Sequence, residues 1–136
     1  MTLKLVYPAL AQIAWTLVVL VIMFMRRRRA VLDKQVRLSE VRVSTDGYPD
    51  HARKAAANFS NQFETPVLFF ALIMLAIETG ATGYIMAVLA WLYVATRVIH
   101  TLVHIGPNQI PVRGGVFAIG VLCLVGMLIG VLLTVL

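Results

Sequence analysis

Residues 5–29 read LVYPALAQIAWTLVVLVIMFMRRRR, an apolar run that ends in four arginines. Gln12 is the only strongly polar side chain before the arginines. A helix of about 20 apolar residues is long enough to cross the hydrocarbon core of a bilayer. The run is too long for the apolar part of a signal peptide, and its charges follow it rather than precede it. We therefore interpret residues 5–25 as a retained transmembrane helix.

The composition of the whole chain agrees with this interpretation. Of 136 residues, 60% are hydrophobic and 13% are charged, whereas soluble domains have about 45–50% apolar and roughly 25% charged residues. These values exclude an ordinary soluble domain and a disordered chain. We expect one all-α integral membrane domain over residues 1–136, folded as a bundle of four transmembrane helices. The expected spans are about 5–25, 55–79, 84–105 and 116–136.

Basic residues are concentrated next to the first span. Nine of the twelve Lys and Arg residues lie between Arg26 and Lys54, and none lies in the turn over 78–83. Cytoplasmic loops are enriched in Lys and Arg, so we expect residues 26–54 in the cytoplasm and both termini outside, in a multi-pass protein of a bacterial inner membrane. Arg26–Arg29 anchor the topology at lipid headgroups or reach an anionic ligand. No nucleic-acid partner is expected, because the basic residues adjoin a span and lack an aromatic platform.

Ionisable side chains inside spans are costly and mark functional sites by default. At 100° per residue, four side chains of the third helix share an arc of about 60°. Four more share an arc of about 100° on the second helix, which is expected to run unbroken from His51 to Thr79 with Asp50 as its cap. Arg113 lies at the start of the fourth helix at the same depth, so we expect one polar cleft at the inner membrane face. The two sets are Tyr93, Arg97, His100 and His104, and Arg53, Ser60, Asn61 and Glu64.

Such a cleft suits a small ligand with several carboxylates, because a guanidinium clamps a carboxylate with two hydrogen bonds. An arginine also favours a thiolate by lowering the pKa of the thiol. Glu64 is the internal counter-ion, and an Arg97–Glu64 ion pair that only fixes helix packing is the alternative. His100 and His104 have the spacing of a two-histidine metal site, but no carboxylate accompanies them on the helix, so no metal is expected.

Two features of the fourth span have structural interpretations. Cys123 is the only cysteine and lies in an apolar run, where a buried and inert thiol is expected. Gly126 and Gly130 form a GxxxG motif, which permits close approach of helices within one chain or between subunits.

Two segments resemble a known family of membrane proteins. Residues 53–66, RKAAANFSNQFETP, resemble the Arg-Ala…Asn-x-x-Glu…Pro signature at the start of the second helix in the MAPEG family, the membrane-associated proteins in eicosanoid and glutathione metabolism. Residues 97–104, RVIHTLVH, followed by PVR at 111–113, resemble the family's Arg-x-x-His-x-x-x-Tyr…Pro-[Ile/Val]-Arg pattern. Spacing and the four-span layout agree over nearly the whole chain.

The resemblance implies a left-up-down four-helix bundle assembled as a homotrimer. Family enzymes bind glutathione as a co-substrate between neighbouring subunits, near the cytoplasmic helix ends. The resemblance gives Arg113 the catalytic role of holding the glutathione thiolate, which attacks a lipophilic small molecule from the bilayer. One of Arg26–Arg29 is available for the family's contact from the first helix. Glutathione contacts are expected at Asn61, Glu64, Arg97 and His100, with Arg53, Tyr93 and His104 in the same cleft.

Three positions depart from the family pattern. His104 stands in place of the family's Tyr, Gly114 where one member has Ser, and Phe117 where some members have Tyr. A glutathione-dependent transferase or peroxidase is the favoured function, and a non-catalytic lipid-binding or scaffold protein on the same fold is the alternative. A small multidrug transporter of this length is disfavoured, because it depends on a glutamate that the first span lacks.

The register of the second-helix motif has two solutions. Asn61 fits Asn-x-x-Glu, but Ala57 then stands where the family usually has Arg. Asn58 puts Lys54 at that place and leaves Asn61 in the Glu position. The sequence alone is compatible with both registers.

The charge distribution predicts the topology. A reporter that is active only outside the cytoplasm is expected to be active when fused after Leu136, because the basic segment holds residues 26–54 on the cytoplasmic side. The same reporter inserted after Ser44 is expected to be inactive. A C-terminus found in the cytoplasm contradicts this assignment.

Overall fold

Long apolar helices account for most of the computed structural model, which describes residues 2–136. Four helical stretches are long and apolar enough to cross a membrane, so the all-α four-span architecture is confirmed. Within the described residues, the elements are α1 (Leu3–Leu32), η1 (Leu38–Val41), α2 (Asp50–Ser60), η2 (Asn61–Phe63), α3 (Thr65–Thr79), α4 (Tyr84–Ile105) and α5 (Ile110–Val135).

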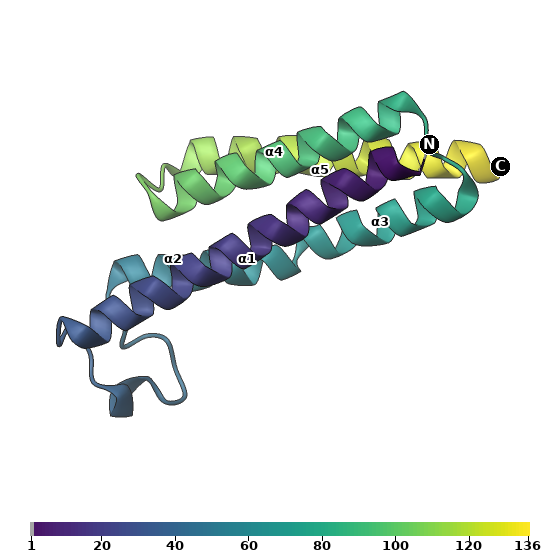
Figure 1. The fold of residues 1–136 in the computed structure, drawn as a ribbon. Helices are drawn as coiled ribbons and strands as arrows, with labels where there is room; N and C mark the ends of the chain where they lie inside the picture. The colour runs from purple at the N-terminus through teal and green to yellow at the C-terminus, as the bar shows by residue number, and fades with distance from the viewer. Residues whose placement is uncertain (1) are drawn as a thin grey trace.

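The bundle has two distinct ends (Figure 1). Both termini and the turn between α3 and α4 lie at one, which we call the terminal end. The 33–49 and 106–109 connections lie toward the other, the basic end. α1 has 30 residues, about 45 Å of helix, against a hydrocarbon core of about 30 Å. The arginine-bearing ends of α1 and α2 accordingly extend past α4 and α5 in Figure 1.

The second span is interrupted, so the expectation of one unbroken helix over 51–79 was wrong. α2 ends at Ser60, η2 follows, and Glu64 leaves helical geometry with φ −94° and ψ −103°. Pro66 is the cause, because its nitrogen carries no hydrogen and its ring clashes with the carbonyl four residues earlier, that of Gln62, so a helix cannot continue through this turn. The expected cap is also absent: Asp50 is the first residue of α2 and makes no side-chain capping bond.

A chain of buried hydrogen bonds joins α1, α2, η2 and α4. Gln12 Nε2 donates to Gln62 Oε1 (3.2 Å), and Gln62 Nε2 donates to the Asn58 carbonyl (3.3 Å). Asn58 Oδ1 accepts from Thr101 Oγ1 (3.3 Å), which accepts from Trp15 Nε1 (3.3 Å). Hydrocarbon offers no hydrogen-bonding partners, so these bonds fix the interrupted second span against α1 and α4.

Glycines of α5 allow it to pack closely on α4. A Cβ at Gly120 lies 2.9 Å from Thr96 Oγ1, and one at Gly126 lies 3.1 Å from the Leu89 side chain. Gly130 approaches Met86 on α4 in the same way. The GxxxG motif therefore serves packing within the chain. Cys123 is buried and free, as expected.

The close approach at Gly120 predicts a stability difference. Gly120→Leu is expected to destabilise the protein by about 1–3 kcal/mol, the usual cost of overpacking, because Thr96 occupies the space. Gly115→Leu is the control, since nothing lies within 4 Å of a Cβ at that position. The measurement is the temperature at which the solubilised protein loses its gel-filtration peak. Equal temperatures for the two variants contradict the packing described.

Candidate functional site

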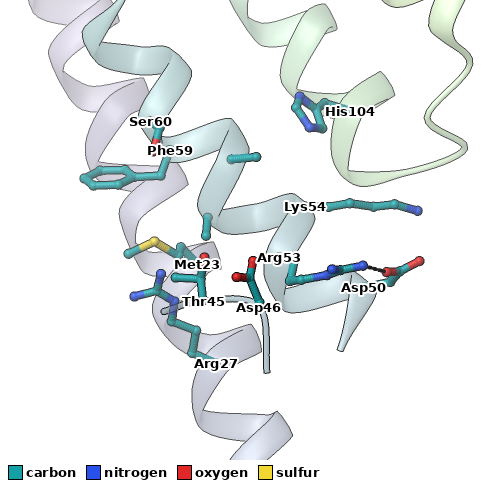
Figure 2. A pocket seen from close by; sticks show the side chains of 12 residues that line it. Met23, Arg27, Thr45, Asp46, Asp50, Arg53, Lys54, Phe59, Ser60 and His104 are labelled. Carbon is teal, nitrogen blue, oxygen red and sulfur yellow. Dashed lines mark hydrogen bonds and ion pairs between the residues drawn. The ribbon is translucent and has the colours of Figure 1, made fainter. Parts of the chain in front are cut away.

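The basic end holds a cavity of about 650 Å³ between α1, the 33–49 connection, α2 and the end of α4 (Figure 2). We call it the basic-end pocket. Its volume lies within the range of small-molecule sites, about 300–1,000 Å³. Its charged and ionisable lining consists of Arg27, Asp46, Asp50, Arg53, Lys54 and His104.

The pocket carries more positive than negative charge. Arg53 Nη2 lies 2.6 Å from Asp50 Oδ1, so these two charges offset each other at the rim. Asp46 Oδ2 accepts a hydrogen bond from Ser44 Oγ (2.6 Å). Lys54 makes no salt bridge with any residue of 2–136, and in Figure 2 its side chain points away from Arg27. The lining can therefore accept a ligand with carboxylates and one ammonium group.

The arginines at the end of α1 have different surroundings. Arg26 Nη1 donates to the carbonyls of His51 (3.2 Å) and Ile105 (3.3 Å), which ties α1 to α2 and α4. Arg27 lines the pocket, with its guanidinium carbon 5.4 Å from the centre of the Tyr48 ring. Arg26 thus has a structural role, and Arg27 is the arginine of this group that a pocket ligand can reach.

Two histidines of α4 carry unpartnered polar atoms, and one of them, His104, lines the basic-end pocket. His104 is 7% exposed and His100 is 4% exposed, and their ring centres lie 5.7 Å apart. Nδ1 of each is buried without a hydrogen-bond partner among the described residues. Because an unpaired buried polar atom costs about 1–3 kcal/mol, these nitrogens favour a bound ligand or water. Residues 2–136 contain no group of three potential metal ligands.

Arg97 is buried beside the interruption of the second span. Its side chain is 2% exposed, and Nη2 donates to the Asn61 carbonyl at 3.5 Å. Its Nε has no partner among the described residues. The alternative of an Arg97–Glu64 ion pair is not observed. Instead, the Asn61 amide, oriented to satisfy both of its polar atoms, donates to Glu64 Oε1 at 3.1 Å.

Arg113 lies in the first turn of α5 and is partly buried. Its Nη1 donates to Asn108 Oδ1 at 2.7 Å. Lys54 and His104 line the basic-end pocket, whereas Arg97 and Arg113 are not part of its lining.

Comparison with known families gives a match to the MAPEG family over residues 5–133. The chain belongs to the MAPEG family. No curated protein and no solved structure matches it. The match covers all four candidate spans, so this MAPEG protein is an integral multi-pass membrane protein, and the resemblance inferred from its two polar motifs is confirmed.

The two registers of the MAPEG motif differ in which residue, Asn58 or Asn61, corresponds to the asparagine of the family motif. Asn58 is 1% exposed, and its side chain is engaged by Thr101 in the chain interior. Asn61 is partly exposed and contacts Glu64. This arrangement favours Asn61 as the ligand-facing residue, while Lys54, which the other register aligned with the family's Arg, lines the pocket.

Tyr93 lies apart from the polar groups. It is fully buried, its hydroxyl donates to Thr65 Oγ1 (3.0 Å), and its ring stacks on Phe69 with centres 4.6 Å apart. The structure gives Tyr93 a packing role between α3 and α4. Arg27 was expected only as one of Arg26–Arg29, and the pocket lining singles it out from that group. Asp46 was not among the residues expected in the site. It comes to the pocket through the fold of the 33–49 connection, for which the sequence has no periodic signal.

Proposed function

We propose that this MAPEG protein is a membrane-embedded, glutathione-dependent transferase or peroxidase that acts on lipophilic electrophiles. Family membership supports the use of glutathione, which MAPEG proteins generally employ. The observation that carries the proposal is the net positive lining of the basic-end pocket, where Arg27, Arg53 and Lys54 lie with His104.

The pocket lining matches the charges of glutathione. Glutathione has two carboxylates and one ammonium group at neutral pH. Arg27 and Lys54 can bind the carboxylates, and Asp46 can accept from the ammonium group. His104 Nδ1, which lacks a partner among the described residues, supplies a further polar contact. The residues present therefore fit glutathione.

Arg113 is the proposed catalytic residue. Its charge and the positive end of the α5 dipole both favour a thiolate over a thiol. The thiolate attacks the electrophilic carbon of a lipophilic substrate, a carbon–sulfur bond forms, and the leaving group departs with its electron pair. With a hydroperoxide, the thiolate attacks the terminal oxygen, the oxygen–oxygen bond breaks, and the alkoxide leaves with its electron pair and takes up a proton. A second glutathione then reduces the sulfenic acid, which gives the disulfide and water. The substrate arrives from the bilayer, with the basic end facing the cytoplasm.

We also propose that the protein is a homotrimer with the site at subunit boundaries. Glu64 is exposed and precedes an α3 of 15 residues, so it lies about 22 Å from the terminal end. That depth is inside a hydrocarbon core of about 30 Å, where an exposed carboxylate is costly. A neighbouring subunit removes Glu64 from lipid, and trimers are common in this family.

Native mass spectrometry in mild detergent tests the assembly. The expected species has the mass of three chains, and Glu64→Gln is expected to retain it, because the neutral side chain keeps the same shape. A wild-type protein that stays monomeric contradicts a shared site.

Arg113→Ala tests the catalytic role. Its loss is expected to raise the pKa of the bound thiol by at least about one unit, so thiolate and turnover fall about tenfold at neutral pH and recover as the pH is raised. The readout is thiolate absorbance and turnover against pH, with the trimer intact.

Arg28→Ala is the matched control, because Arg28 is exposed and adjoins three other arginines. It is expected to leave thiol titration and turnover unchanged. If Arg113→Ala also leaves both unchanged, Arg113 is only a topology anchor and the catalytic proposal fails.

A non-catalytic lipid-binding protein is the second candidate function. It is favoured by His104 and Phe117, which replace tyrosines of other family members. Glutathione binding without conjugation of any electrophile in the same preparation would support this candidate over the enzyme.

A further inference from the structure

A groove of about 630 Å³ lies between the beginnings of α1 and α4, at the terminal end, and shares no lining residue with the basic-end pocket. We call it the α1–α4 groove. α1 contributes Lys4 and Tyr7 to its lining. The α4 lining consists of Tyr84, Ala87, Val88, Trp91, Leu92 and Ala95.

The α4 residues of the groove form one continuous face. They recur at intervals of three and four residues, which places them on the same side of the helix. From Tyr84 to Ala95 the face extends over about 16 Å, close to half of a hydrocarbon core of about 30 Å. The groove is therefore as long as one leaflet is thick. Ala87 and Ala95 leave room along it for a chain of methylene groups.

Polarity is ordered along the groove. Lys4, Tyr7 and Tyr84 gather at the terminal end, where α1 and α4 both begin. Helix N-termini carry partial positive charge, and neither first turn contains an acidic residue. Lys4 makes no salt bridge within residues 2–136. Apart from Trp91, the rest of the lining consists of aliphatic side chains.

We propose that the α1–α4 groove binds an anionic phospholipid of the outer leaflet. Lys4 pairs with the phosphate, Tyr7 and Tyr84 lie at the level of the headgroup, and one acyl chain lies along α4 as far as Ala95. Lysines and aromatic rings at membrane interfaces occupy this depth. A purely apolar occupant leaves Lys4 unpaired. The groove between α3 and α5 has no charged residue in its lining, so the same argument does not extend to it.

Tryptophan fluorescence can report on this groove alone. The chain has two tryptophans, and Trp91, which is 48% exposed, lines the groove. In Trp15→Phe, all tryptophan fluorescence comes from Trp91. If Trp15→Phe folds poorly, the Trp91 signal is obtained instead by subtracting the fluorescence of Trp91→Phe from that of the wild type. The probes are phosphatidylglycerol and phosphatidylcholine with brominated acyl chains, which quench nearby indoles, in vesicles containing the full-length protein.

Brominated phosphatidylglycerol is expected to reach half-maximal quenching of Trp91 at about one-fifth of the mole fraction that brominated phosphatidylcholine needs. This fivefold preference corresponds to about 1 kcal/mol, the attraction between one lysine and an anionic headgroup. Lys4→Gln is expected to abolish this preference. Arg28→Gln, at the basic end, is expected to leave it intact.

Three results overturn the proposal. Equal quenching by the two lipids shows that the groove does not select an anionic headgroup. A preference that survives Lys4→Gln removes Lys4 as the phosphate ligand. Weak quenching by both lipids shows that protein, such as a second copy of the chain, covers the groove.

Discussion

The backbone interruption before Pro66 is the constraint on which the rest of the structure depends. Pro66 cannot donate the hydrogen bond that a continuous helix sends to the Gln62 carbonyl, and an unsatisfied carbonyl in a bilayer costs several kcal/mol. At the interruption, the Asn61 carbonyl accepts from the Glu64 backbone at 3.4 Å and from the Arg97 side chain at 3.5 Å. Arg97 is thus tied to the interrupted backbone inside the bundle, and the Gln62 side chain joins the same segment to α1.

The electrostatics of the site follow from that placement. Arg97 is buried without an ion pair, and Lys54, which has no salt bridge among the described residues, lines the basic-end pocket together with His104. Asp50, an acid of the pocket, is already engaged by Arg53. An uncompensated buried cation destabilises the folded protein, and an anion that binds there recovers stability in proportion to its affinity. The arrangement is therefore suited to a ligand that becomes more negative in the site, as a thiol does when it ionises.

Hydropathy was sufficient to predict four long apolar helices. α4 coincides with the expected third span, Tyr84–Ile105, because apolar length and flanking turn residues both mark its ends. The second span could not be predicted in the same detail. Counting 100° per residue assumes an unbroken helix, and the interruption at Glu64 rotates the residues before it relative to α3. Arg53 pairs with Asp50 one turn earlier on α2, and Lys54 lines the pocket without a salt bridge among the described residues.

The positions of Tyr93 and Arg27 show a second limit. Tyr93 shares a helical face with Arg97 and the histidines, but the neighbour at its depth is Phe69 of α3, so it packs in the core. Helical periodicity predicts on which side of a helix a residue lies, but it does not predict which residues of the neighbouring helix that side contacts. Arg27 and Asp46 meet only through the 33–49 connection, whose path depends on tertiary contacts and not on periodicity.

Proton release on glutathione binding tests the central claim most directly. The free thiol is almost fully protonated at pH 7, so binding as a thiolate releases about one proton per site. Calorimetric titration of the solubilised protein in buffers of different ionisation enthalpy measures that number, with S-methylglutathione as the reference that has no thiol to ionise. The account predicts saturable binding of both, with a proton released only by glutathione. Absence of saturable binding, or the same proton count for both ligands, contradicts it.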